Sequence, residues 1–141
     1  MSHRHRARRL ALQGLCCLDV QGDGAAAVVR QFMDDSREAP ETIETAHEML
    51  CRTLGERQRI DDLLTRHARH WGLGRLALVD RNILRLAAWE LLEKVTPVKV
   101  VISEALRIAQ EFSTAESPRF VNGVIDAVAK ELQQAQPQTG G

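Results

Sequence analysis

Apolar residues recur three or four positions apart along almost the whole chain, and this spacing limits the fold more than any other feature. The longest example covers residues 76–93, where Val79, Ile83 and Leu86 fall on one face of a helix. Further runs with the same period cover residues 4–20, 25–33, 40–54, 56–70, 97–112 and 118–132. The pattern predicts an all-α fold, a compact bundle of roughly seven helices in two packed groups.

Length and composition favour a single domain. With 141 residues, 44% of them hydrophobic, the chain can bury one core. We predict one helical domain over residues 1–134 and a disordered tail over 135–141, where glutamine, proline and glycine predominate. Residues 71–74 contain two glycines and are expected to connect two helices.

Two helix starts carry the same short signal. Thr96 precedes Pro97, and Ser117 precedes Pro118. A hydroxyl side chain followed by proline is typical of an N-cap and the first helical position. We therefore expect Thr96 and Ser117 to cap their helices.

The cysteines indicate a reducing compartment. Cys16 and Cys17 are adjacent and Cys51 stands alone, so the set is odd and lacks C-x-x-C spacing. No apolar run approaches the ~20 residues of a membrane span, and no signal-type segment follows the basic start of the chain. We expect a cytoplasmic protein with no membrane partner.

Metal-ligating and catalytic motifs are weak. His47 and Cys51, and likewise His67 and His70, are spaced to share a helix face, but no known ligand spacing joins the two pairs. The sequence has no glycine-rich phosphate loop, nucleophile elbow or paired-carboxylate motif. We predict no metal, no cofactor and no enzymatic activity.

Positive charge gathers at the start of a chain whose net charge is zero. The run 3–9 carries four arginines and two histidines, and no acidic residue comes before Asp19. Arginine pairs with phosphate through a planar fork and stacks on bases, so the run is a candidate RNA contact. The alternative is a solvated helix start that binds nothing.

Residues 113–120 form a second candidate site. Free N–H groups at the start of the following helix attract anions, Arg119 adds charge, and Phe120 offers a stacking face. The alternative is an ordinary helix start with Phe120 in the core.

Asp80 and Glu90 lie beside the apolar face of the 76–93 helix and need cationic partners, either internal arginines such as Arg81 or Arg85 or a bound protein.

Three segments resemble the NusB family. They are Val79 to Leu91 (VDRNILRLAAWEL), Pro97 to Ala105 (PVKVVISEA) and Phe120 to Asp126 (FVNGVID), preceded by Arg8 to Leu15 (RRLALQGL). The likeness spans almost the whole chain in the same order. It implies an all-helical protein that binds single-stranded boxA RNA together with the ribosomal protein NusE. Such a complex joins other Nus factors on RNA polymerase and suppresses termination in ribosomal RNA operons.

The resemblance also implies roles for individual residues. RNA contacts fall on Arg4, His5, Arg6, Arg8 and Gln13 in the first helix, and on Glu116, Ser117, Arg119 and Phe120 at the last helix. Asp80, and with less support Glu90, fall on the surface that faces NusE. The chain departs from the family at Cys16 and Leu18, which replace an aromatic pair. Losing a stacking contact costs about 1–3 kcal/mol per base.

Two other functions remain open at this point. The chain could serve as an RNA-binding module accessory to a ribosomal RNA cytosine methyltransferase, which would require a separate catalytic subunit. It could also be an interaction module that dimerises through the surface bearing the basic run, so a homodimer is left open.

Overall fold

The chain was analysed as a computed structural model, which describes residues 2–68 and 76–134. Within these ranges the protein contains seven α-helices, one short 3₁₀ helix and no strand, which confirms the all-α prediction. The elements are α1 (His3–Gln21), η1 (Asp23–Ala25), α2 (Ala26–Asp34), α3 (Pro40–Gly55), α4 (Arg57–His67), α5 (Leu78–Glu93), α6 (Val98–Phe112) and α7 (Ser117–Gln134). None of the described helices is both long and apolar enough to cross a membrane.

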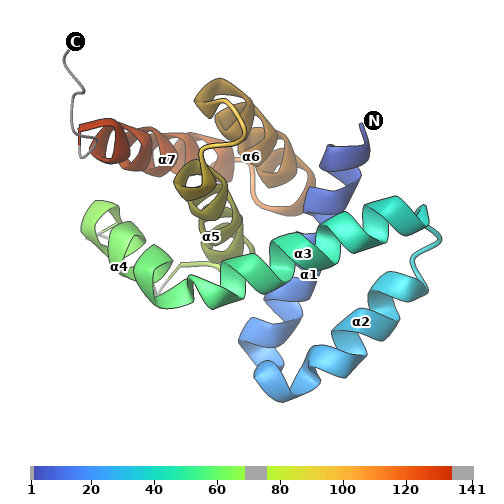
Figure 1. The fold of residues 1–141 in the computed structure, drawn as a ribbon. Coiled ribbons are helices and arrows are strands. Elements are labelled where there is room, and N and C mark those ends of the chain that lie inside the picture. The colour runs from blue at the N-terminus through green and yellow to red at the C-terminus, as the bar shows by residue number, and fades with distance from the viewer. Residues whose placement is uncertain (1, 69–75, 135–141) are drawn as a thin grey trace, which may run out of the picture.

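The helices pack in two groups (Figure 1). In the first group α1 crosses α3, and α2 packs against both. In the second group α5, α6 and α7 pack on one another, and α4 contacts α5 and α7. Contacts of α1 and α3 with α5 join the groups, so α1 reaches both halves of the protein.

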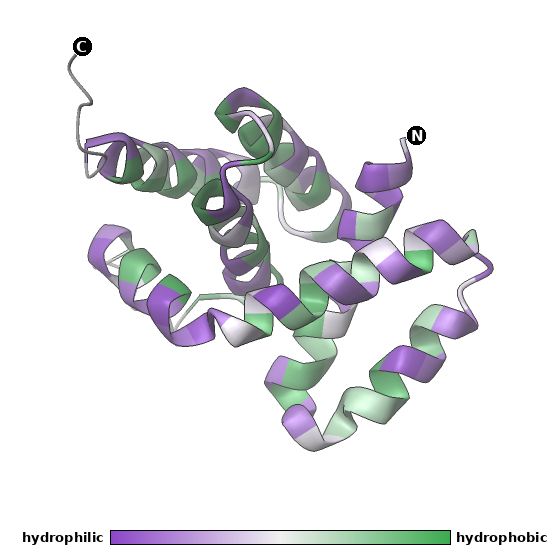
Figure 2. Ribbon diagram, in the orientation of Figure 1, coloured by the Kyte–Doolittle hydropathy of each residue, from purple (hydrophilic) through white to green (hydrophobic). Residues whose placement is uncertain are grey.

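The core follows the apolar stripes of the sequence. Figure 2 shows apolar and polar residues alternating along the helices at helical spacing. Leu84 of α5, Leu12 of α1 and Ile125 of α7 are fully buried, and each such side chain stabilises the fold by about 1.5–3 kcal/mol relative to exposure. Gly14 of α1 allows α2 to approach closely, because a Cβ there would lie 3.0 Å from the side chain of Val29. Burial thus fixes which face of α1 points inward.

Helix starts differ from the sequence prediction at two places. Helix α6 begins at Val98 with Pro97 as the N-cap residue, and Thr96 instead donates its hydroxyl to Glu90 at 3.5 Å. Helix α7 begins at Ser117 itself, whose hydroxyl donates to Asp80 of α5. Both hydroxyls therefore satisfy carboxylates of α5. The predicted connector at 71–74 and the predicted tail at 135–141 lie outside the described residues.

Candidate nucleic-acid interface

Helix α1 divides the basic run between two environments. The helix is capped by Ser2, whose hydroxyl accepts a hydrogen bond from the His5 N–H at 3.1 Å. Successive side chains then point about 100° apart, so a run of basic residues cannot all face the same way. Arg6 is exposed and the Arg4 side chain is 48% exposed, whereas His5 and Arg8 are buried.

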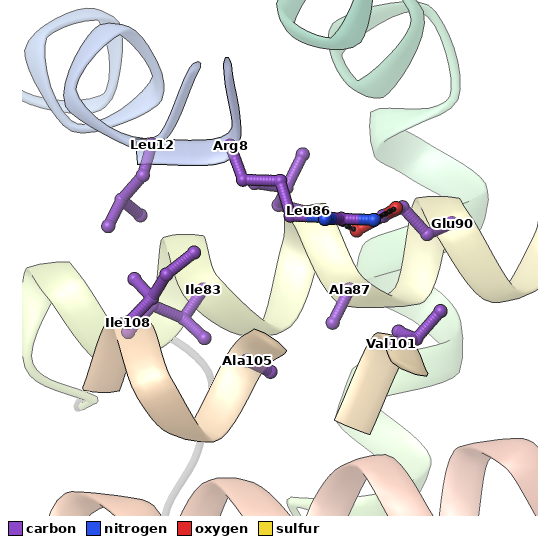
Figure 3. Close-up of a pocket in the computed structure, with 9 residues that line it drawn as sticks. All are labelled: Arg8, Leu12, Ile83, Leu86, Ala87, Glu90, Val101, Ala105 and Ile108. Carbon is purple, nitrogen blue, oxygen red and sulfur yellow. Dashed lines mark hydrogen bonds and ion pairs between the residues drawn. The ribbon is translucent and has the colours of Figure 1, made fainter. Parts of the chain in front are cut away.

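Arg8 forms a buried ion pair with Glu90. Its Nε and a terminal nitrogen donate to the two carboxylate oxygens at 2.9 and 2.8 Å, and both side chains are only 4% exposed. Figure 3 shows the guanidinium reaching from α1 along Leu86 to meet the carboxylate of α5. Two parallel bonds satisfy charges that would be costly to bury alone. This pair fastens α1 to α5.

His5 is buried between two carboxylates of α6. Its Nε2 lies 3.0 Å from Glu111, and its Nδ1 contacts Glu104. None of the side-chain surface of His5 is exposed. His5 and Arg8 are therefore corrected from predicted RNA contacts to links between α1 and the second helix group.

Glu90 pairs with an internal arginine, as one sequence alternative had it, whereas the Asp80 carboxylate accepts hydrogen bonds from serines instead of Arg81 or Arg85. Glu90 is paired with Arg8, so the prediction that it faces NusE is corrected to a role in the core. Arg81 lies 2.7 Å from Asp19, and Arg85 bonds Asp61 at 2.9 Å.

The arginines around Asp19 also shift its pKa. Burial opposes the charged form, but hydrogen bonds from Asn82 and Arg81 and the charge of Arg85 outweigh it, so the pKa of Asp19 is lowered. Next to it, burial and the charge of Asp19 raise the pKa of Cys16 to about 11. Position 16 thus carries a half-buried neutral thiol.

The outward side of α1 borders a groove. Arg6, Arg9 and Gln13 line it together with Phe32 of α2, and its volume is about 440 Å³. Gln13 and Arg6 are exposed, as the predicted RNA contact requires. Arg9 extends toward α6 instead, where its Nε lies 2.9 Å from Glu111 and its guanidinium carbon lies 5.4 Å from the centre of the Phe112 ring.

The second predicted region lines a larger pocket of about 790 Å³. Its walls are Leu76, Ala77, Asp80, Thr114, Ala115, Glu116, Ser117, Arg119 and Phe120. Glu116 and Arg119 are exposed, Phe120 is half-buried, and Ser117 is buried. Phe120 is thus placed between the two sequence alternatives, since it packs partly on the core and partly lines the pocket.

Asp80 connects the pocket to the loop before α7. Its carboxylate accepts hydrogen bonds from Ser117 and, at 2.7 Å, from Ser113. The residue predicted to face a protein and the residues predicted to contact RNA thus share one pocket. Arg9 of the groove on α1 lies over the ring of Phe112, the last residue of α6, next to Ser113.

Sequence reasoning missed two residues of this surface. Arg9 was counted in the basic run but given no role, and Phe32 was treated as part of an ordinary short helix. Only the exposure of Phe32 beside α1 marks it, and exposure depends on how α2 packs. The His47 and Cys51 pair lies 3.7 Å apart, and among the described residues no three potential ligands gather into a metal site.

Comparison with known proteins gives a consistent result. The sequence profile of the NusB family matches residues 5–130. A protein from Solibacter usitatus named transcription antitermination protein NusB is 41% identical over 136 residues, which cover 95% of this chain and 93% of that protein. The T. maritima NusB structure has a TM-score of 0.81 at 35% identity and covers 93% of this chain and 92% of its own.

A further solved structure contains NusE and an RNA, and its RNA is double-stranded where the resemblance implies a single strand. It is a crystal structure of the antitermination factors NusB and NusE in complex with double-stranded RNA. The likeness has a TM-score of 0.82 at 25% identity and covers 93% of this chain and 98% of that one.

Proposed function

The chain belongs to the NusB family, and we propose that it is a transcription antitermination factor that binds boxA RNA together with NusE. Through that complex it joins other Nus factors and RNA polymerase in the cytoplasm and promotes read-through in ribosomal RNA operons. Its role is binding, with no catalytic step. One observation carries the proposal: the Asp80 carboxylate holds the loop that leads to Arg119, so the surfaces that we propose for NusE and for RNA share one pocket.

The RNA surface of this proposal is narrower than the basic run. It consists of Arg4, Arg6 and Gln13 on α1 with Glu116, Arg119 and Phe120 at α7. The three arginines are exposed and can release counterions from phosphates. The net charge of the chain is zero, so attraction comes from this local cluster and not from the whole protein.

NusE enters the proposal at the pocket. A cationic group of NusE that reaches Asp80 would lie beside the serine hydroxyls that hold the α6–α7 loop. A loop that NusE has already fixed loses less conformational entropy when RNA binds. NusE binding is therefore expected to tighten RNA binding.

The test is binding of a boxA-containing RNA and of a scrambled RNA, each with and without NusE. The variant changes Arg4, Arg6 and Arg119 together to Ala. Arg59→Ala is the matched control, because Arg59 is a 67% exposed arginine of α4 outside this surface. We expect the natural chain and the control to prefer boxA, more strongly with NusE, and the triple variant to lose that preference.

Equal and weak binding of both RNAs with and without NusE would overturn the proposal. Co-purification with a ribosomal RNA methyltransferase under those conditions would favour the accessory role instead.

A further inference from the structure

The groove between α1 and α2 has the composition of a nucleotide site. Its lining residues are Arg6, Arg9, Leu10 and Gln13 from α1 and Phe32, Asp35, Ser36 and Glu38 from α2 and the segment after it. Its volume of about 440 Å³ falls within the ordinary range of small-molecule sites. Cationic, aromatic and acidic side chains therefore line one groove.

Phe32 supplies the aromatic wall. Helix α2 buries Val29 and Met33 in the core, whereas the Phe32 side chain beside them is 45% exposed. It is the one aromatic residue among the strongly exposed large apolar side chains of residues 2–68 and 76–134. A water-exposed ring beside arginines is a platform on which any base can stack.

Two charged side chains of the groove are not used by the fold. In the described part of the chain, neither the Arg6 guanidinium nor the Glu38 carboxylate has an ion pair or side-chain hydrogen bond. Asp35 differs, because one of its oxygens accepts from Gln31 at 2.9 Å. Arg6 is thus free for a phosphate, and Glu38 for a group with N–H donors.

We propose that this groove binds one guanine nucleotide of the RNA strand. The base stacks on Phe32, Glu38 accepts the adjacent N–H donors of its Watson–Crick edge, and Arg6 pairs with its phosphate. Guanine fits because its imino and amino groups present two donors side by side to a carboxylate, whereas the same edge of uracil presents only one. This inference rests on the proposed function, because it assumes that the ligand is an RNA strand.

The groove also offers a stacking face where Cys16 and Leu18 offer none. Cys16 is half-buried and Leu18 is 3% exposed, so neither offers a stacking face. Phe32 lines the groove together with Gln13, which precedes those positions on α1. Stacking is thereby supplied from α2.

The experiment measures RNA affinity of the full-length chain and two groove variants, Phe32→Ala and Glu38→Gln. Val28→Ala is the matched control, since Val28 lies one turn earlier on α2, is 59% exposed and does not line the groove. The probes are a boxA-containing RNA and two short oligouridines, one with a single central guanosine and one with inosine in its place. Inosine lacks the amino group but keeps the imino N–H. Thermal melting of each variant verifies that it is folded.

Three results are expected. Phe32→Ala weakens binding of all three RNAs by about fivefold or more, whereas Val28→Ala leaves it unchanged. The natural chain binds the guanosine RNA about fivefold or more tightly than the inosine RNA. Glu38→Gln removes that difference and leaves the stacking contribution in place.

The groove proposal and the proposed function fail in different ways. If Phe32→Ala binds boxA RNA as tightly as Val28→Ala does while Arg119→Ala weakens it, the groove proposal is overturned and the proposed function stands. If the natural chain does not distinguish boxA from scrambled RNA, the proposed function is overturned. The guanosine and inosine oligomers still decide the groove in that case, and equal binding of the two would overturn it.

Discussion

The inner and outer faces of α1 use the same residue types for opposite purposes. His5 and Arg8 point inward and are held by carboxylates of α5 and α6, whereas Arg6 and Gln13 point outward and line an open groove. Their order along the chain does not separate them, because inward and outward positions alternate within one turn. A run of positive charge in a sequence can therefore contain both a structural element and a binding surface.

The largest expected effect concerns the inner face. Arg8→Ala removes the two-bond partner of the buried Glu90 carboxylate and leaves it only the longer contacts with Thr96 at 3.5 Å and Arg4 at 3.9 Å, so we expect the free energy of unfolding to fall by about 3 kcal/mol. Arg6→Ala removes an exposed side chain and should change it by no more than about 0.5 kcal/mol. Urea denaturation of both variants measures the difference.

A double variant sharpens this comparison. Replacing Arg8 and Glu90 together by Met and Leu removes both charges, and the stability should recover much of the loss seen in Arg8→Ala. Equal, small losses for Arg8→Ala and Arg6→Ala would mean that the two faces do not differ as described.

The next effect concerns the carboxylate that holds the α6–α7 loop. Asp80→Ala removes the acceptor of two serine hydroxyls and leaves the buried Ser117 without it, so we expect a loss of about 1–3 kcal/mol. Asp126→Ala is the control, because Asp126 is a 52% exposed residue of α7 whose ion pair is with Lys130, one turn along the same helix. Denaturation midpoints that match for the two variants would show that the serine contacts do not hold the loop.

A smaller effect is expected in the salt dependence of RNA binding. Each arginine that neutralises one phosphate of single-stranded RNA contributes about 0.7 to the slope of log affinity against log salt. Arg6→Ala and Arg119→Ala should each reduce the slope by about that amount, and Arg59→Ala should leave it unchanged. Titrations at a series of salt concentrations measure these slopes, and an unchanged slope for Arg6→Ala would remove Arg6 from the RNA surface.

The smallest effect comes from a surface ion pair between α4 and α7. Hydrogen bonds from Arg66, then from His67, lower the pKa of Glu131 to about 2. A lowered pKa means that the pair stabilises the fold above about pH 4.5 and that this stabilisation is lost as pH falls toward about 2. Because the side chain is 31% exposed, its contribution is about 1 kcal/mol or less.

Thermal melting of the natural chain and of Glu131→Gln across this pH range checks the sign. The melting temperatures of the two proteins should differ at neutral pH and converge in acid. A gap that widens as pH falls would contradict the assignment.

The sequence predicted the helices well because their signal is local. The apolar period of residues 76–93 corresponds to α5, whose described bounds are Leu78–Glu93, and the other stripes match their helices within a few residues. Thr96 and Ser117 were misread as caps because the carboxylates they bond, Glu90 and Asp80, belong to another helix. Local rules cannot see a partner brought near by packing.

The candidate site was predicted less completely for the same reason. Arg6, Gln13 and Arg119 are exposed as expected, but burial of His5, Arg8 and Glu90 depends on where α5 and α6 cross α1. A resemblance assigns roles to sequence positions, but it does not show which of those charged side chains are buried. Phe32 is the opposite case: the sequence assigned it no role, and only the placement of α2 reveals its exposed ring.

The most direct test follows the side-chain signals of the arginines and Gln13 by NMR while a boxA-containing RNA is added to the isotope-labelled chain. We predict that the Nε–H signals of Arg6 and Arg119 and the amide of Gln13 shift, while the Nε–H of Arg8, held 2.9 Å from Glu90, does not. Shifts at Arg8 with none at Arg6 or Arg119 would contradict the division of α1 into a structural face and an RNA-binding face.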